Sequence, residues 1–105
     1  MIFLCSLDAV PERQARAFRI DNVSLFALRF DGEIHVYRNS CPHLGVELNW
    51  AGDVFFDRDD TLLQCATHGA LFLPQSGECV AGPCRGQRLQ AVISRIDGDS
   101  IYVQP

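Results

Sequence analysis

Two short loops contain the residues with the clearest capacity for chemistry. Residues 41–45 read CPHLG and residues 65–69 read CATHG, so each loop supplies one cysteine, one histidine and a closing glycine. Thiolates and imidazoles bind transition metals, and glycine lets a backbone wrap closely around a bound group. The chain has three histidines, and two of them stand within three residues of a cysteine. This arrangement predicts a metal centre whose ligands are Cys41, His43, Cys65 and His68.

The ligand pattern, C-x-H followed by C-x-x-H-G, resembles the Rieske iron-sulfur family, in which cysteines hold one iron and histidines the other. The resemblance implies one [2Fe-2S] cluster, with Cys41 and Cys65 on the inner iron and His43 and His68 on the outer iron. Residues 31–37 resemble the family's entry hairpin, and residues 69–83 its exit strand and covering proline loop. Essentially the whole chain is therefore similar to the soluble, low-potential ferredoxin branch of the family.

The mixed ligand set has a physical consequence for the cluster. With two neutral imidazoles in place of two thiolates, the oxidised cluster carries no net formal charge, whereas four thiolates would make it a dianion. Adding an electron to an uncharged site costs less Coulomb energy, so histidine ligation raises the reduction potential.

The resemblance also sets where in the Rieske range the potential should lie. The high-potential branch carries a disulfide between the two loops, where this chain has Val46 and Thr67. The same branch places two hydroxyl donors near the cluster, where this chain has Ala70 and Phe72. Without these donors the resemblance implies a potential near the low end of the range, about −150 mV.

A single structural zinc ion is the main alternative, because two cysteines and two histidines also suit tetrahedral zinc. Zinc motifs usually place two cysteines in one segment and two histidines in another, whereas each loop here contains one of each. The gap of 21 residues between His43 and Cys65 is longer than the commonest spacing in the Rieske family. We expect its acidic part, residues 53–60, to form an extended solvated hairpin.

Length and composition restrict the function classes. The 105 residues, 48% apolar and 21% charged, predict a single domain over residues 1–105. The net charge of −4 argues against nucleic-acid binding, and no segment approaches the roughly 18 apolar residues of a membrane span. An odd count of five cysteines and an N-terminus that does not resemble an export signal predict a cytoplasmic protein with reduced cysteines.

The elements that position the loops are predicted to be strands. Alternating apolar residues predict strands over 24–30, 33–38, 88–96 and 100–103, which we expect to form part of a base sheet. Turns are expected at Asp31-Gly32 and at residues 97–99. Residues 1–6 are expected to form a further strand, and residues 12–16 at most a helical turn. The predicted fold is all-β, a Rieske-type antiparallel β-sandwich base with a smaller loop-rich cluster-binding insert.

That insert is expected at about residues 39–83, where glycines and prolines interrupt the chain and leave room only for short strands at 62–65 and 71–73. Trp50 and the pair Phe55-Phe56 are expected to pack beneath it. Cys5 is interpreted as a small buried hydrophobe and His35 as a non-ligand on a strand. For Cys79 and Cys84, in the covering loop, the sequence leaves open a disulfide, a redox role or neither.

These features predict a one-electron transfer protein that turns over no substrate by itself. The leading hypothesis is a ferredoxin that delivers electrons from a reductase to a terminal oxygenase. The alternative is a small Rieske-like subunit of a nitrite reductase-type complex, bound to a larger reductase subunit. The chain is too short to be a complete oxygenase. An apolar rim, made of Pro42, Leu44, Leu71 and Pro83, is expected around the histidines as the surface on which a partner docks.

Overall fold

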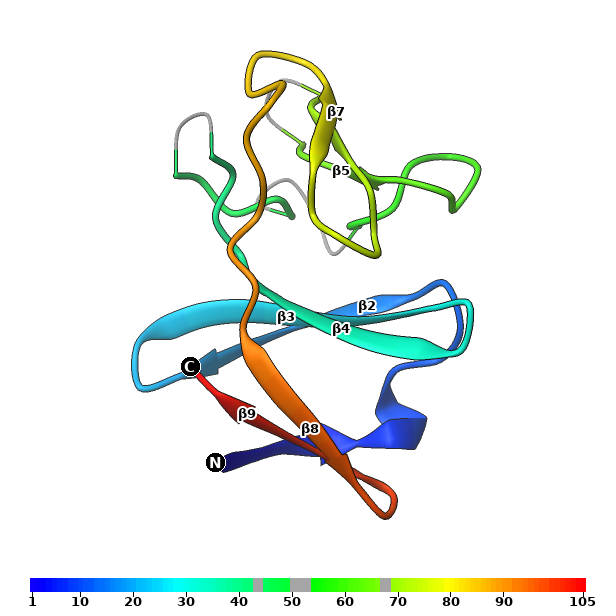
Figure 1. The fold of residues 1–105 in the computed structure, drawn as a ribbon, viewed down its shortest axis with the longest axis vertical. Helices are drawn as coiled ribbons and strands as arrows, with labels where there is room; N and C mark the ends of the chain where they lie inside the picture. The colour runs from blue at the N-terminus through cyan, green and yellow to red at the C-terminus, as the bar shows by residue number, and fades with distance from the viewer. Residues whose placement is uncertain (43–44, 50–53, 67–68) are drawn as a thin grey trace.

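The computed structural model describes residues 1–42, 45–49, 54–66 and 69–105, and these residues form strands with almost no helix (Figure 1). The strands are β1 (Ile2–Ser6), β2 (Ala15–Ile20), β3 (Val23–Phe30), β4 (Glu33–Arg38), β5 (Leu63–Gln64), β6 (Leu71–Phe72), β7 (Cys79–Ala81), β8 (Ile93–Asp97) and β9 (Ser100–Gln104). A single turn of 3-10 helix spans Leu7–Ala9. Within these described ranges all named strand pairs are antiparallel, which confirms the predicted all-β class.

The strands form three small sheets, with the orders β1-β9-β8, β2-β3-β4 and β5-β6-β7. The first two sheets make the lower half of the molecule, which we call the base, and the third lies in the upper half (Figure 1). The insert was expected at about residues 39–83; we extend it to residues 39–87, as far as they are described, because the N–H of Cys79 donates to the carbonyl of Gln87. The expectation that the four long strands share one base sheet was wrong, because β3 and β4 pair with β2, whereas β8 and β9 pair with β1.

Strand β2 corrects the prediction of at most a helical turn at residues 12–16. It pairs with β3 along its whole length, from Ala15 opposite Leu28 to Ile20 opposite Val23. The two strands are joined by Asp21 and Asn22, whose φ angles of 49° and 67° are both positive. Positive φ at both central residues is the signature of the two-residue turn that matches the twist of a hairpin.

Strand β3 is buried on both of its faces. Phe26, Leu28 and Phe30, which the sequence analysis placed on one side of a strand, join the core cluster beneath the insert. Leu25 and Ala27 point the other way and join the cluster that contains residues of the opposite base sheet, such as Ile101 and Val103. Since side chains alternate along a strand, one central strand supplies both cores.

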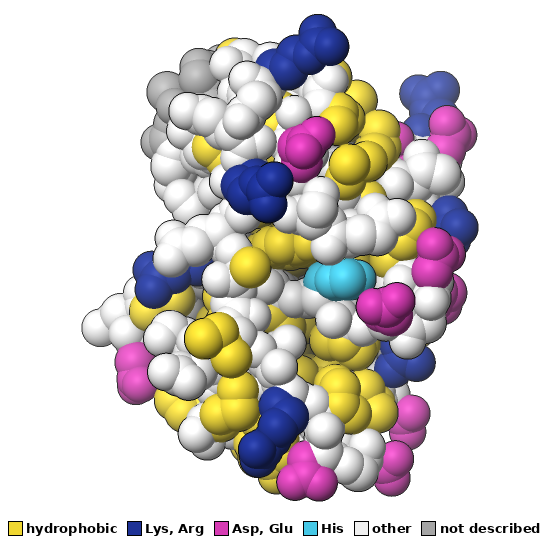
Figure 2. Space-filling view, in the orientation of Figure 1, with side chains coloured by type: hydrophobic (Ala, Val, Ile, Leu, Met, Phe, Trp, Pro, Cys, Tyr) yellow, Lys and Arg dark blue, Asp and Glu magenta, His cyan; other side chains and the backbone are white. Residues whose placement is uncertain are grey.

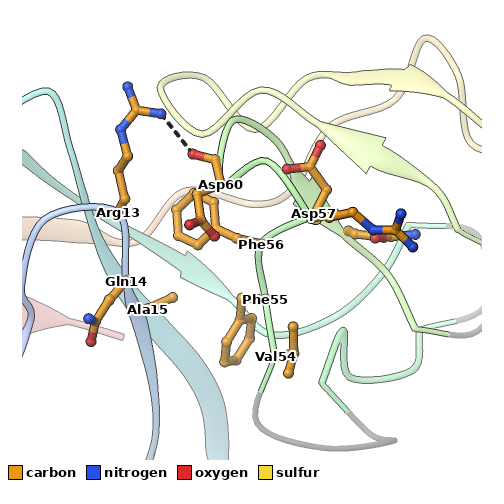
Figure 3. A pocket seen from close by; sticks show the side chains of 10 residues that line it. Arg13, Gln14, Ala15, Val54, Phe55, Phe56, Asp57 and Asp60 are labelled. Carbon is orange, nitrogen blue, oxygen red and sulfur yellow. Dashed lines mark hydrogen bonds between the residues drawn. The ribbon is translucent and has the colours of Figure 1, made fainter.

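Two phenylalanines fix the insert onto the base. Phe55 stacks on Phe26 with ring centroids 4.6 Å apart, and Phe56 stacks on Phe30 at 6.4 Å. The predicted packing of Phe55 and Phe56 beneath the insert is confirmed, while Trp50 lies outside the described residues. The hairpin that carries them is also anchored at its tip, where Arg13 Nη1 donates a hydrogen bond of 3.0 Å to the carbonyl of Asp60 (Figure 3).

An open groove of about 480 Å³ lies between this hairpin and the start of β2. Figure 3 shows Phe55 and Phe56 between the two segments, with Asp57 and Asp60 on the hairpin above them. Asp57 and the three residues after it are solvent-facing for the most part, as expected for a solvated hairpin. Of the expected hairpin range, Asp53 lies outside the described residues.

The chain returns from the insert to the base along β4 (Figure 1). The N–H of Arg38 donates to the carbonyl of Gln90 at 2.9 Å, and the N–H of Val92 donates to the carbonyl of Val36 at 2.9 Å. The strand predicted over 88–96 therefore begins only at Ile93, because the preceding residues pair irregularly with β4 and with the insert.

On the surface, acidic and arginine side chains are interspersed over the face shown in Figure 2 and do not gather into an area of one sign. In the part of the chain that the structure describes, no helix has the length and apolar character to cross a membrane.

Candidate metal centre

The two cysteine loops are closed by the same pair of backbone hydrogen bonds. In the first loop, the N–H of Cys41 donates to the carbonyl of Val46 at 2.7 Å, and the N–H of Gly45 donates back to the carbonyl of Cys41 at 2.7 Å. In the second loop, Cys65 bonds to Ala70 at 2.9 Å and Gly69 bonds to Cys65 at 3.0 Å in the same way. The two loops therefore present their cysteines on equivalent backbone frames.

Glycine is needed at the closing position of both loops. Gly45 has a φ of 72° and Gly69 a φ of 69°, in the left-handed region that other residues seldom adopt. Each glycine stands four residues after its cysteine and donates its N–H back to the carbonyl of that cysteine. The glycines thus allow each loop to close on its own cysteine.

The sulfurs that these loops present are buried. Cys41 is 2% exposed and Cys65 is 1% exposed, and both belong to the core cluster beneath the insert. The loops are also tied together, since the N–H of Ala66 donates to the carbonyl of Leu48 at 2.9 Å and the N–H of Leu48 donates to Asn39 Oδ1 at 2.8 Å. Buried thiols held on rigid loops suit a centre that is shielded from water.

The other two predicted ligands, His43 and His68, lie outside the described residues, as do Leu44 and Thr67. Among the described residues, no group of three or more histidines, cysteines and acids is arranged to hold a metal ion. The described part of the site therefore supplies two of the four predicted ligands. The complete ligand set stays a prediction.

A third segment, residues 79–87, consists of β7 and the loop that follows it and lies against both cysteine loops; we call it the covering loop. It touches the second cysteine loop at Gly82, where a Cβ atom would lie only 2.8 Å from the Cα of Ala70. Gly82 has a φ of 101°, so both its conformation and its close approach require glycine. The Gly82-Pro83 pair lies in this covering segment, where the resemblance places the proline loop.

The covering loop also buries the two extra cysteines. Cys84 Sγ donates a hydrogen bond of 2.9 Å to Cys79 Sγ, and Cys79 Sγ donates to the carbonyl of Ala81 at 3.2 Å. Cys79 and Cys84 are thiols in the structure, not a disulfide. Burial, reinforced by the neighbouring Cys79 and Cys41, raises the pKa of Cys84 to about 12. Cys84 therefore stays protonated at neutral pH.

The contact between Cys84 and Cys41 was missed by the sequence analysis. The two residues are far apart in the chain and meet only because the covering loop folds back over the first cysteine loop. A cysteine within two residues of Gly82-Pro83 was the one signal that could have suggested it.

The remaining residues singled out from the sequence take structural roles. His35 lies in β4 with its ring stacked against Tyr37, at a centroid distance of 6.5 Å. Cys5 is 9% exposed and belongs to the core of the base. Burial raises the pKa of Cys5, as expected for a cysteine that packs as a small hydrophobe. The interpretation of Cys5 as a small buried side chain is confirmed, and His35 lies on a strand as expected.

The described residues fit an iron-sulfur cluster. Two buried cysteine sulfurs stand on equivalent loops, each followed in the sequence by a histidine and a glycine, and a third loop covers them. Thiolates are the common ligands of such clusters, and burial limits the access of water.

Comparison with known proteins agrees with this donor set. A family model for the Rieske [2Fe-2S] domain matches residues 1–96. Among curated proteins, the cholesterol 7-desaturase of Caenorhabditis elegans is 27% identical over 81 residues, which are 76% of this chain. The chain spans only 18% of the length of that relative.

Solved structures resemble the chain over nearly its whole length. The ferredoxin of carbazole 1,9a-dioxygenase from Nocardioides aromaticivorans IC177 has a TM-score of 0.78 and 23% identity, covering 100% of this chain and 99% of that one. A chain from a complex of reduced oxygenase and oxidised ferredoxin of carbazole 1,9a-dioxygenase has a TM-score of 0.79 and 18% identity, covering 98% and 100%.

A chain from a complex of carbazole-bound oxygenase and ferredoxin also matches, with a TM-score of 0.78 and 15% identity, and there the match covers 97% of this chain and 27% of that one. At such identities the solved structures establish the fold. The family model, which covers most of the sequence, establishes more: this chain belongs to the Rieske [2Fe-2S] domain family and carries one [2Fe-2S] cluster.

Proposed function

We propose that the chain is a ferredoxin that accepts one electron from a reductase and passes it to a terminal oxygenase. The observation that carries this proposal is the pair of matched cysteine loops in a chain that spans almost the full length of two small solved chains, one of them a ferredoxin of an oxygenase system. The cluster supplies the capacity to hold and release a single electron. The protein then needs no substrate pocket beside it.

The ligands in this proposal are Cys41, His43, Cys65 and His68. Support comes from the burial of the two cysteines and from the positions of the histidines, since His68 directly precedes the closing Gly69 and His43 stands two residues before Gly45. Cys41 and Cys65 would hold the inner iron, and the histidines the outer one. Because Cys41 and Cys65 are buried, the inner side of the centre would be shielded from water, and an electron would enter and leave on the side of the histidines.

A low potential is part of the proposal. Ala70 and Phe72, which stand where the high-potential branch has hydroxyl donors, are both completely buried. Neither side chain can donate a hydrogen bond to the cluster, so the reduced state is stabilised less. We expect a midpoint near the low end of the Rieske range, about −150 mV.

The docking surface would be the apolar rim named above. Pro42 and Leu71 are half-buried and Pro83 is exposed, which leaves apolar surface beside the cysteine loops, while Leu44 lies outside the described residues. Transient redox complexes bury little area, below about 1,200 Å². A small apolar rim suits such a brief contact. We further propose that residues 1–105 act as one domain and that the protein works in the cytoplasm.

Stopped-flow mixing tests this function. The reduced, cluster-bound protein is mixed with an oxidised oxygenase of the carbazole 1,9a-dioxygenase type, and reoxidation of the cluster is followed by visible absorbance. We expect transfer at least about tenfold faster than to free oxygen, and slower transfer from Leu44→Asp. The matched control is Ile93→Asp, which changes an aliphatic side chain that is 63% exposed in β8 of the base.

Equal rates for Leu44→Asp, Ile93→Asp and the unmodified protein would refute the docking surface. The absence of any transfer to oxygenases, together with stable co-purification with a large reductase subunit, would replace the ferredoxin by the subunit role.

A further inference from the structure

A third buried thiol stands beside one of the proposed ligands. The side chain of Cys84, which is 2% exposed, is in hydrogen-bonding contact with Cys41 as well as with Cys79. A cysteine thiol is ordinarily protonated at neutral pH and has one hydrogen to donate. The question is therefore which of the two sulfurs receives that hydrogen when the cluster is bound.

The backbone of the covering loop fixes the position of Cys84. The N–H of Cys79 donates to the carbonyl of Gln87 at 2.8 Å, and the N–H of Gln87 donates to the carbonyl of Cys84 at 2.9 Å. The close packing of Gly82 on Ala70 ties the same loop to the second cysteine loop. The Cys84 sulfur therefore stays beside Cys41 without a change in the fold.

The two acceptors differ in charge once iron is present. Cys79 Sγ donates its own hydrogen to the carbonyl of Ala81 at 3.2 Å and offers Cys84 only a neutral thiol sulfur. Cys41, as an iron ligand, is a thiolate, and hydrogen bonds to an ionised acceptor are roughly twice as strong as neutral ones. Rotation about the Cβ–Sγ bond of Cys84 is enough to redirect its hydrogen from Cys79 to Cys41.

We propose that Cys84 donates an S–H hydrogen bond to the Cys41 sulfur in the cluster-bound protein and thereby raises the reduction potential of the cluster. Reduction increases the negative charge on the cluster and its thiolate ligands, so a donor to Cys41 stabilises the reduced form more than the oxidised form. The inference rests on the proposed ligand set. It assigns to the covering loop a second task besides excluding water, that of tuning the potential.

Redox titration of three variants tests this role. In Cys84→Ala we expect the midpoint potential to become more negative by about 59 mV. For one electron, this shift corresponds to a tenfold change in the equilibrium constant of reduction. Cys84→Ser keeps a hydrogen-bond donor, so its midpoint potential should stay close to that of the unmodified protein. Cys79→Ala is the matched control, because it removes a thiol of equal 2% exposure from the same loop and leaves the donor to Cys41 in place.

An unchanged midpoint in Cys84→Ala, or an equal negative shift in Cys79→Ala, would overturn the inference, because the effect would then be absent or due to packing alone. A positive or zero shift in Cys79→Ala supports it, since the competing acceptor has been removed.

A second measurement uses the unmodified protein. In reduced-minus-oxidised infrared difference spectra, the S–H stretch that disappears in Cys84→Ser should move to lower frequency on reduction, because the hydrogen bond becomes stronger. A band that does not move in cluster-bound protein would overturn this inference alone. A preparation without iron and acid-labile sulfide would overturn the ligand set, and this inference with it.

Discussion

The base and the insert of this molecule are held together in different ways. In the base, β3 pairs with six residues of β2 on one side and six of β4 on the other, and both of its faces are buried. In the insert, β5 and β6 are two residues long, and each cysteine loop is closed by only a pair of backbone hydrogen bonds. The base is stabilised by strand pairing and by its core, whereas the insert depends on the bound cluster for its stability.

The difference explains why the site is built on the insert. Binding residues often lie on loops held by a rigid scaffold, and here two such loops place Cys41 and Cys65 in one core cluster. The insert packs onto aromatic side chains of the base, chiefly Phe26 and Phe30. Strand β3, which carries both residues, therefore supports the site.

Removal of the iron should produce the largest difference in stability between the insert and the base. We expect hydrogen exchange in the insert to accelerate by more than about a hundredfold, since a group that binds only the folded state stabilises it in proportion to its binding. Exchange in β2, β3 and β4 should change little. Mass spectrometry of exchanged peptides checks this, and an insert that stays as protected as before would show that the cluster is not its main support.

Cutting the aromatic contact between the regions should have the next largest effect. Phe55→Ala removes a buried ring stacked on Phe26 and should lower the free energy of unfolding by about 3–5 kcal/mol. Phe3→Ala, which truncates a ring that is 55% exposed on β1, should cost about 1 kcal/mol. Denaturant titrations compare the two, and similar costs would mean that the stack contributes little.

A glycine pair measures how closely the covering loop packs. Gly82→Ala should cost about 1–3 kcal/mol more than Gly86→Ala, because its Cβ would press against Ala70 in addition to the strain of a positive φ. Gly86 has a similar φ of 93° but no atom within 4 Å of the added carbon. Thermal melts followed by cluster absorbance test the pair. Equal losses would contradict the close contact between the covering loop and the second cysteine loop.

Alkaline pH should loosen the junction between the regions by a smaller amount. The Tyr37 hydroxyl donates to the carbonyl of Pro74 at 2.7 Å, and burial raises the pKa of Tyr37 from 10.0 to about 12, opposed by Arg88. The folded protein therefore keeps this proton when the unfolded chain releases it, so stability falls as pH rises above about 10. By pH 11 the loss should reach about 1.4 kcal/mol.

Tyr37→Phe isolates that contribution. The variant loses the hydrogen bond to Pro74 and should be about 1 kcal/mol less stable at neutral pH, yet its stability should fall less steeply between pH 9 and 11. If the free energy of unfolding falls with pH equally in the variant and the unmodified protein, the assignment of this pH dependence to Tyr37 is contradicted.

Local sequence signals predicted much of the fold. The Asp31-Gly32 turn between two alternating segments fixes the hairpin of β3 and β4, since both residues adopt positive φ, as the turn requires. The cysteines and glycines of the two loops were likewise readable, because a closing glycine must follow four residues after each cysteine for the loop to curl.

Other features depend on tertiary contacts that no local pattern encodes. Strand β2 mixes arginines with small alanines and becomes a strand through its pairing with β3. The base is divided into two sheets because β1 pairs with β9 whereas β2 pairs with β3. Strand β8 starts late because residues 88–92 first run along β4. The approach of Cys84 to Cys41 has the same origin.

The most direct test of the central claim is electron paramagnetic resonance of the dithionite-reduced protein, with iron and acid-labile sulfide measured on the same sample. Ligation by Cys41, His43, Cys65 and His68 predicts a rhombic signal whose average g value is lower than that of a [2Fe-2S] protein with four cysteine ligands. A four-cysteine type of signal, or a folded, colourless protein that contains zinc and no sulfide, would contradict the account.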